Sequence, residues 1–125
     1  MMKNIAKSVT DPAILASYKA NLDALSGDMY VCHGLLEPSN IIITDDGVPY
    51  LLDWMDASAG SIAADAAATV LSMQLRYPKE IAEMYLHTFC RKLKMDTALV
   101  REWIPLVAAS RLAAANVDER EYYRA

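Results

Sequence analysis

Residues 33–54 read HGLLEPSNIIITDDGVPYLLDW, and this stretch decides the fold. A polar loop ends at Asn40, a run of β-branched residues follows it, and a second apolar run ends at Asp53. The Asp-Gly pair between the runs is typical of a tight turn, so we expect hairpin strands at about 41–44 and 48–52. A hairpin returns the chain to its starting end and places Asn40 beside Asp53. Amide and carboxylate oxygens are ligands that Mg²⁺ prefers.

This layout resembles the catalytic loop of protein kinases, and more closely that of the aminoglycoside phosphotransferase and choline kinase-like family. The family's loop reads His-Gly-Asp-x-x-x-x-Asn, and His33, Gly34 and Asn40 match it. The family's metal-binding motif reads Asp-Trp, and residues 53–54 match that motif. The resemblance implies that Asn40 and Asp53 are ligands of Mg²⁺, and that the magnesium ion accompanies ATP.

One position departs from the family pattern, because Leu35 stands where the family carries its catalytic Asp. A leucine side chain can neither accept a proton nor orient a hydroxyl group, and loss of a general base costs about 10²–10⁴-fold in rate. Glu37 is two residues further along, and we expect its side chain to leave the loop in another direction. We therefore assign no catalytic residue: Leu35 occupies the base position and His33 is a loop residue.

Asp65 lies inside an otherwise apolar helix that we expect from Ala63 to about Leu75. A carboxylate among apolar residues costs free energy unless it is hydrogen-bonded. The resemblance implies that Asp65 accepts hydrogen bonds from the backbone of the catalytic loop. The alternative is a carboxylate that faces solvent and interacts with the helix dipole. In both cases the role of Asp65 is structural.

The rest of the chain reads as helix, apart from a short buried strand expected at about 29–32. Asp11 is expected to cap a helix that begins at Pro12, and Asp96 to cap the last long helix. Pro105 should kink or restart that last helix. A turn at 77–78 precedes another helix, in which His87 is expected on the surface. The apolar stripe predicted for that helix consists of Ile81, Met84, Tyr85, Phe89 and Leu93.

Aromatic residues near the C-terminus have two interpretations. Trp103, Tyr122 and Tyr123 could form an aromatic wall for a substrate, but core packing is favoured for Trp103. The last helix is expected to end at 113–116, before an acidic turn at 118–121.

These patterns predict a mainly α (α+β) fold, the C-terminal lobe of the kinase-like fold, with helices packed around one short β-hairpin. We expect residues 1–125 to form a single domain without the family's N-terminal nucleotide-binding lobe. The four glycines are scattered singly, so no Gly-rich phosphate loop is present, and the first 25 residues read as helix. The chain would then be a natural short protein, the product of a truncated gene or an expressed fragment.

Composition excludes several other classes of protein. A chain with 54% hydrophobic and 22% charged residues is globular, and its net charge of −4 argues against nucleic acid or an anionic membrane as partner. No apolar run approaches the roughly 20 residues that span a bilayer, and no signal peptide is evident. Cys32 and Cys90 form no metal-binding spacing, so we expect reduced core thiols in a cytoplasmic protein.

Two functions remain open at this stage. The first is a fragment or degenerate member of an ATP-dependent small-molecule phosphotransferase family, which acts on hydroxyl groups of aminoglycosides or amino-alcohols and is inactive by itself. The second is a non-catalytic module, a pseudoenzyme that uses the apolar face of the lobe for self-association or partner binding. We expect a homo-oligomer, because exposed apolar patches are rare on monomers.

Overall fold

The computed structural model describes residues 1–2, 5–6, 9–25 and 29–112 of the chain. The elements are α2 (Pro12–Leu25), β1 (Tyr30–Cys32), the 3-10 helix η1 (Pro38–Asn40), β2 (Ile41–Ile43), β3 (Pro49–Leu51), β4 (Ser58–Gly60), α3 (Ile62–Arg76), α4 (Lys79–Leu93) and α5 (Thr97–Leu112). The prediction of a mainly α (α+β) fold is confirmed. The C-terminal turn expected at 118–121, the helix end at 113–116 and the two tyrosines after them lie outside the described residues.

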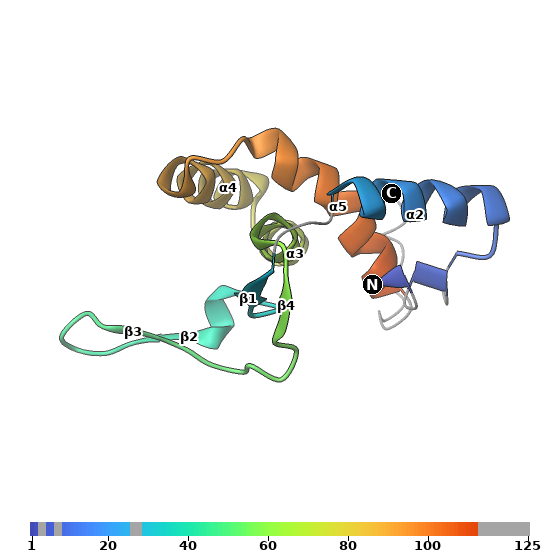
Figure 1. Cartoon of the computed structure of the whole chain (residues 1–125). Coiled ribbons are helices and arrows are strands. Elements are labelled where there is room, and N and C mark those ends of the chain that lie inside the picture. The colour runs from blue at the N-terminus through green and yellow to red at the C-terminus, as the bar shows by residue number, and fades with distance from the viewer. Residues whose placement is uncertain (3–4, 7–8, 26–28, 113–125) are drawn as a thin grey trace.

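Helix α3 lies at the centre of the molecule, with α4 and α5 packed against it (Figure 1). The helix begins where the Ser61 hydroxyl accepts hydrogen bonds from the backbone N–H groups of Ala63 and Ala64, at 3.2 and 3.4 Å. Four of its nine buried residues are alanine, and such small side chains let neighbouring helices approach closely. The core around it consists of Ile5, Ala63, Ala66, Ala67, Ala68, Val70, Leu71, Leu86, Cys90, Val100, Trp103, Leu106, Val107, Ala108 and Ala109.

The buried face of α4 differs from the predicted stripe. Ala82, Leu86 and Cys90 are buried, whereas Met84 is 62% and Leu93 48% exposed. The prediction followed the largest apolar side chains, but the three buried residues share one face, at i, i+4 and i+8, and that face meets the core. The predicted members that do pack against the core are Tyr85 and Phe89.

Both predicted helix caps are present. The Asp11 carboxylate accepts a hydrogen bond from the backbone N–H of Ala13 at 2.8 Å, and Asp96 accepts one from that of Ala98 at 2.9 Å. The last helix continues through Pro105 without restarting. Proline has no N–H to donate within the helix, and α5 changes direction along its length in Figure 1.

The strands form two antiparallel sheets of two strands each among the described residues. The predicted hairpin is confirmed as β2 and β3, with Ile41 opposite Leu51, and it extends away from the helices (Figure 1). The predicted strand before the loop, β1, is paired with β4, with Tyr30 opposite Gly60. The prediction that this strand is buried is wrong, because Tyr30 is 53% and Val31 83% exposed and only Cys32 faces the interior. Strand β4 was not predicted, because three residues carry no measurable hydrophobic period and their partner is remote in sequence.

Side chains outside the site follow the predictions from the sequence. Cys32 and Cys90 are free and buried, and burial raises the pKa of both thiols. His87 is exposed, with its Nε2 3.6 Å from a carboxylate oxygen of Glu83. Arg101 of α5 donates to the same carboxylate at 2.7 Å, which lowers the pKa of Glu83. None of the described helices is long and apolar enough to cross a membrane.

Candidate functional site

The loop after β1 is hydrogen-bonded to α3 through one carboxylate. Asp65 Oδ2 accepts the backbone N–H of His33 at 3.0 Å, and Asp65 Oδ1 accepts that of Gly34 at 2.9 Å. Both carboxylate oxygens therefore bind consecutive backbone donors, 31 and 32 residues away in sequence. This contact is the one that the resemblance implies for Asp65, and it fixes the start of the loop on the central helix.

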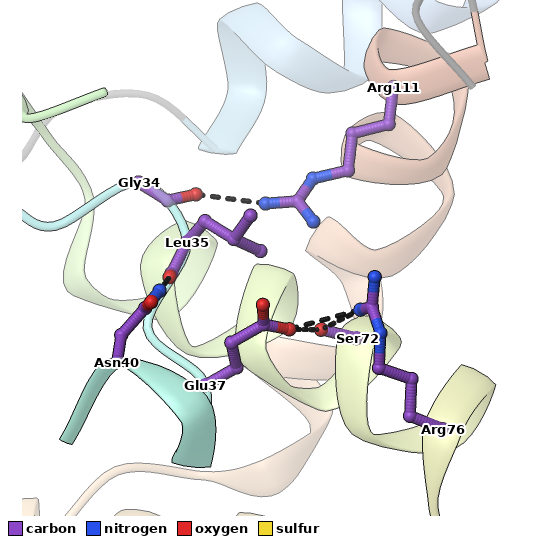
Figure 2. Close-up of polar contacts among 7 residues, drawn as sticks. All are labelled: Gly34, Leu35, Glu37, Asn40, Ser72, Arg76 and Arg111. Atoms are coloured by element: carbon purple, nitrogen blue, oxygen red, sulfur yellow. Dashed lines mark hydrogen bonds and ion pairs between the residues drawn. The ribbon is translucent and has the colours of Figure 1, made fainter. Parts of the chain in front are cut away.

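Gly34 occupies a position that other residues would strain. Its φ is +94°, and a Cβ atom there would lie 2.5 Å from the carbonyl oxygen of Asp56. The carbonyl of Gly34 in turn accepts a hydrogen bond from Arg111 Nη2 of α5 at 2.8 Å (Figure 2). The backbone of the loop thus lies between Asp56 on one side and the C-terminal part of α5 on the other.

Substitution of the two glycines with positive φ separates the cost of a steric clash from the cost of backbone strain. Gly47 has a φ of +82°, but a Cβ atom added there would meet no atom within 4 Å, so Gly47→Ala introduces strain alone. We expect Gly47→Ala to lower the free energy of unfolding by about 1–2 kcal/mol. Gly34→Ala should cost clearly more, because backbone atoms must also move. Urea denaturation of both variants measures the difference, and equal losses would contradict the close contact with Asp56.

His33 connects the loop to the end of the hairpin. The residue is 3% exposed, its Nε2 lies 2.7 Å from the carbonyl oxygen of Leu52, and its Nδ1 lies 3.3 Å from the backbone nitrogen of Leu35. A carbonyl can only accept and a backbone N–H can only donate, so these partners assign a neutral imidazole with the proton on Nε2. The ring also contacts Trp54, with a centroid distance of 4.7 Å. His33 thereby links the loop to the end of the hairpin.

The hairpin brings Asn40 and Asp53 to the same end. The backbone N–H of Leu52 donates to the carbonyl oxygen of Asn40 at 2.8 Å, which extends the hairpin pairing to the residue before Asp53. Asn40 Nδ2 donates to the carbonyl oxygen of Leu35 at 2.9 Å (Figure 2), so the amide oxygen is the atom left for another ligand. Asp53 is exposed and has a φ of +58° in the left-handed region.

Glu37 is bound to α3 through one oxygen of its carboxylate, Oε2. Its carboxylate accepts hydrogen bonds from the Ser72 hydroxyl and from Arg76 Nη1, the latter at 3.0 Å, and its side chain is 14% exposed (Figure 2). Both partners belong to α3, whereas Arg111 belongs to α5. The ion pair with Arg76 and the hydrogen bond from Ser72 thus hold Oε2 of this carboxylate on the helix.

Three residues of this environment were missed from the sequence. Ser72 and Arg76 are four residues apart, so the sequence predicts that they share one face of the helix. It does not predict that Glu37 binds them. Arg111 binds Gly34, which is 77 residues away in sequence, and no local sequence pattern predicts such a contact. The core interpretation of Trp103 holds, since the residue is 3% exposed.

The loop is bound by a carboxylate of α3 and is followed by a hairpin that ends at Asp-Trp. This arrangement places the protein in the kinase-like class. The family described as the phosphotransferase enzyme family (APH) matches residues 6–104, which include the loop, the hairpin and α3. The chain belongs to this phosphotransferase family. No curated protein and no solved structure gives a significant match to the chain.

Proposed function

We propose that this chain is the metal-binding, loop-bearing lobe of an ATP-dependent small-molecule phosphotransferase, and that it transfers no phosphate by itself. The proposed acceptors are hydroxyl groups of aminoglycosides or amino-alcohols. The observation that carries the proposal is the engagement of Glu37 by Ser72 and Arg76. With Leu35 at the base position, Glu37 carries the one carboxylate of residues 33–40, and its Oε2 is held on α3 by these two side chains.

The donor set at the end of the hairpin fits Mg²⁺. Asn40 offers an amide oxygen, because its nitrogen is bound to the Leu35 carbonyl, and Asp53 offers an exposed carboxylate. Mg²⁺ is commonly held by one or two protein oxygens, with water and substrate phosphates completing the coordination. Within the described ranges no three His, Cys, Asp or Glu residues cluster as a metal cage. Bound Mg²⁺ would neutralise charge on the phosphates of ATP.

A titration with Mn²⁺, used as a paramagnetic substitute for Mg²⁺, tests this site. We expect the amide signals of Asn40 and Leu52 to broaden at millimolar metal, because ligands at one open edge bind weakly. Asp53→Asn should weaken binding by about tenfold or more, through loss of the anionic ligand. Asp45→Asn, on the exposed hairpin turn, is the matched control with the same change of charge. Equal binding by both variants would show that Asp53 is not a ligand.

The alternative, a self-association module, is supported by exposed apolar side chains around the two small sheets. Val31 is 83% exposed, Ile43 68% and Met55 91%. The β2–β3 sheet has two strands only, so both of its outer edges carry unpaired backbone groups that could pair with another strand. The occupant we propose for this surface is a second copy of the chain, in a two-fold arrangement.

Light scattering across a range of concentrations tests self-association. We expect a mass near twice 13.8 kDa at high concentration, falling toward that value on dilution. Met55→Ser should shift the equilibrium toward monomer, because it removes apolar area from the proposed contact. Met84→Ser, at a 62% exposed position on α4, is the control and should leave the mass unchanged. A monomer at every concentration would exclude self-association.

A further inference from the structure

A cavity of about 520 Å³ lies between α2, α3, α5 and the β1–β4 sheet. Its volume falls within the range of about 300–1,000 Å³ that is typical of small-molecule sites. Much of its wall is apolar, with Leu22, Ala68 and Val107 among the lining residues. It is separate from the proposed metal site, because neither Asn40 nor Asp53 lines it.

Arg111 supplies the positive charge in this wall. Its side chain is half-buried, and among the described residues it donates one hydrogen bond, to the Gly34 carbonyl at 2.8 Å. A carbonyl oxygen is neutral, so the charge of the guanidinium is not balanced by an ion pair among the described residues. Guanidinium carries five N–H donors, and most of them remain for another acceptor.

The other polar groups of the wall also favour a molecule that accepts hydrogen bonds. Trp103 Nε1 is buried and has no hydrogen-bond partner among the described residues, which costs free energy that a ligand oxygen within reach would recover. Ser110 adds a hydroxyl group to the lining. Asp65, the acidic residue of the wall, uses both carboxylate oxygens on the loop backbone.

We propose that this cavity binds an amphipathic monocarboxylate, with its carboxylate oxygens accepting hydrogen bonds from Arg111 and Trp103 Nε1 and its hydrocarbon body along the apolar wall. A single guanidinium suits one negative charge. The carboxylate of Asp65 in the same wall disfavours a dianion such as a phosphate monoester. The inference does not rest on the proposed phosphotransferase function, because none of its donors belongs to the metal pair or to the base position.

The indole N–H signals of the full-length protein provide the readout. The sequence has two tryptophans, and Trp54 is exposed and already donates to the Leu51 carbonyl at 2.8 Å. Titration with decanoate, decanol and decylamine separates charge from chain length. We expect the Trp103 signal to shift with decanoate while that of Trp54 does not. Decanol should bind about 10- to 100-fold more weakly, and decylamine should not bind.

Substitutions at Arg111 complete the test. Arg111→Met should reduce decanoate binding by about 10- to 100-fold and leave the weak binding of decanol unchanged. Arg111→Lys keeps the charge and should retain the preference for decanoate over decanol, which distinguishes recognition from general loss of fold. Arg91→Met, at an exposed position of α4, is the matched control. An unmoved Trp103 signal in the wild type, or equal affinity for decanoate and decanol, would overturn the proposal.

Discussion

Incubation of the wild-type protein with Mg-ATP and a panel of aminoglycosides, choline and other amino-alcohols is expected to yield no useful phosphate transfer. Ordinary enzymes turn over at about 1–10³ per second. Without a general base we expect less than about 0.01 per second, at least about 10²-fold below that range. The physical reason is the side chain of Leu35, which cannot accept a proton, together with the engagement of Glu37 by Ser72 and Arg76.

Leu35→Asp is expected to complete the family motif without restoring activity. Phosphoryl transfer depends mainly on positioning and charge stabilisation, and this sequence carries no Gly-rich loop to hold the phosphates of ATP. We expect ATP to bind no tighter than about millimolar, or roughly 4 kcal/mol. Release of labelled phosphate and mass spectrometry of the acceptor measure the outcome.

Two other results would each be informative. Turnover near 1 per second by the wild type would contradict the proposed function, since that range is ordinary for enzymes. In that case Glu37→Gln identifies whether this carboxylate leaves Arg76 and acts as base. Activity that appears only in Leu35→Asp would show that this lobe is sufficient for phosphate transfer and that the wild type is inactive because of residue 35 alone.

Asp65→Ala is expected to produce the largest loss of stability among the substitutions near the loop. Two backbone N–H groups, those of His33 and Gly34, lose a charged acceptor. Hydrogen bonds to charged groups contribute about 1.5–3 kcal/mol each, and the two share one carboxylate, so we expect a loss of about 2–4 kcal/mol. Chemical denaturation monitored by circular dichroism measures it.

Asp65→Asn separates the loop contact from general destabilisation. The amide keeps one acceptor oxygen but presents N–H groups to the second backbone donor, so hydrogen exchange of the amides of His33 and Gly34 should accelerate more than that of the α4 core. Asp45→Asn, on the exposed hairpin turn, should change neither amide. Unaltered exchange at both amides in Asp65→Asn would contradict the role of this carboxylate.

Local sequence was sufficient for the elements that carry strong local signals. The caps at Asp11 and Asp96 and the hairpin around the Asp-Gly turn were predicted because each depends on neighbouring residues. Strand β4 was not, since Ser58–Gly60 becomes a strand only by pairing with β1. The buried face of α4 was misjudged because side-chain size was used, whereas fit against α3 decides burial.

The features of the site also fall into those that the sequence predicts and those that depend on the tertiary structure. The spacing of His33, Asn40 and Asp53 and the presence of Leu35 at the base position follow from the sequence alone, because they depend on a motif and one turn. The tautomer of His33 depends on the carbonyl that folding brings to Nε2, so only the tertiary structure decided it. The same holds for the direction of the Glu37 side chain.

What the sequence determined by itself is therefore the list of chemical groups and their local order: a loop that contains Leu35, a hairpin, and the side-chain oxygens of Asn40 and Asp53 at its two ends. What only the tertiary structure decided is which remote groups meet. Arg111 reaches the Gly34 carbonyl across 77 residues, and Trp103 becomes part of the same cavity wall. Such contacts arise from the packing of α5 against α3 and the loop, and packing between distant segments leaves no periodic signal in a single sequence.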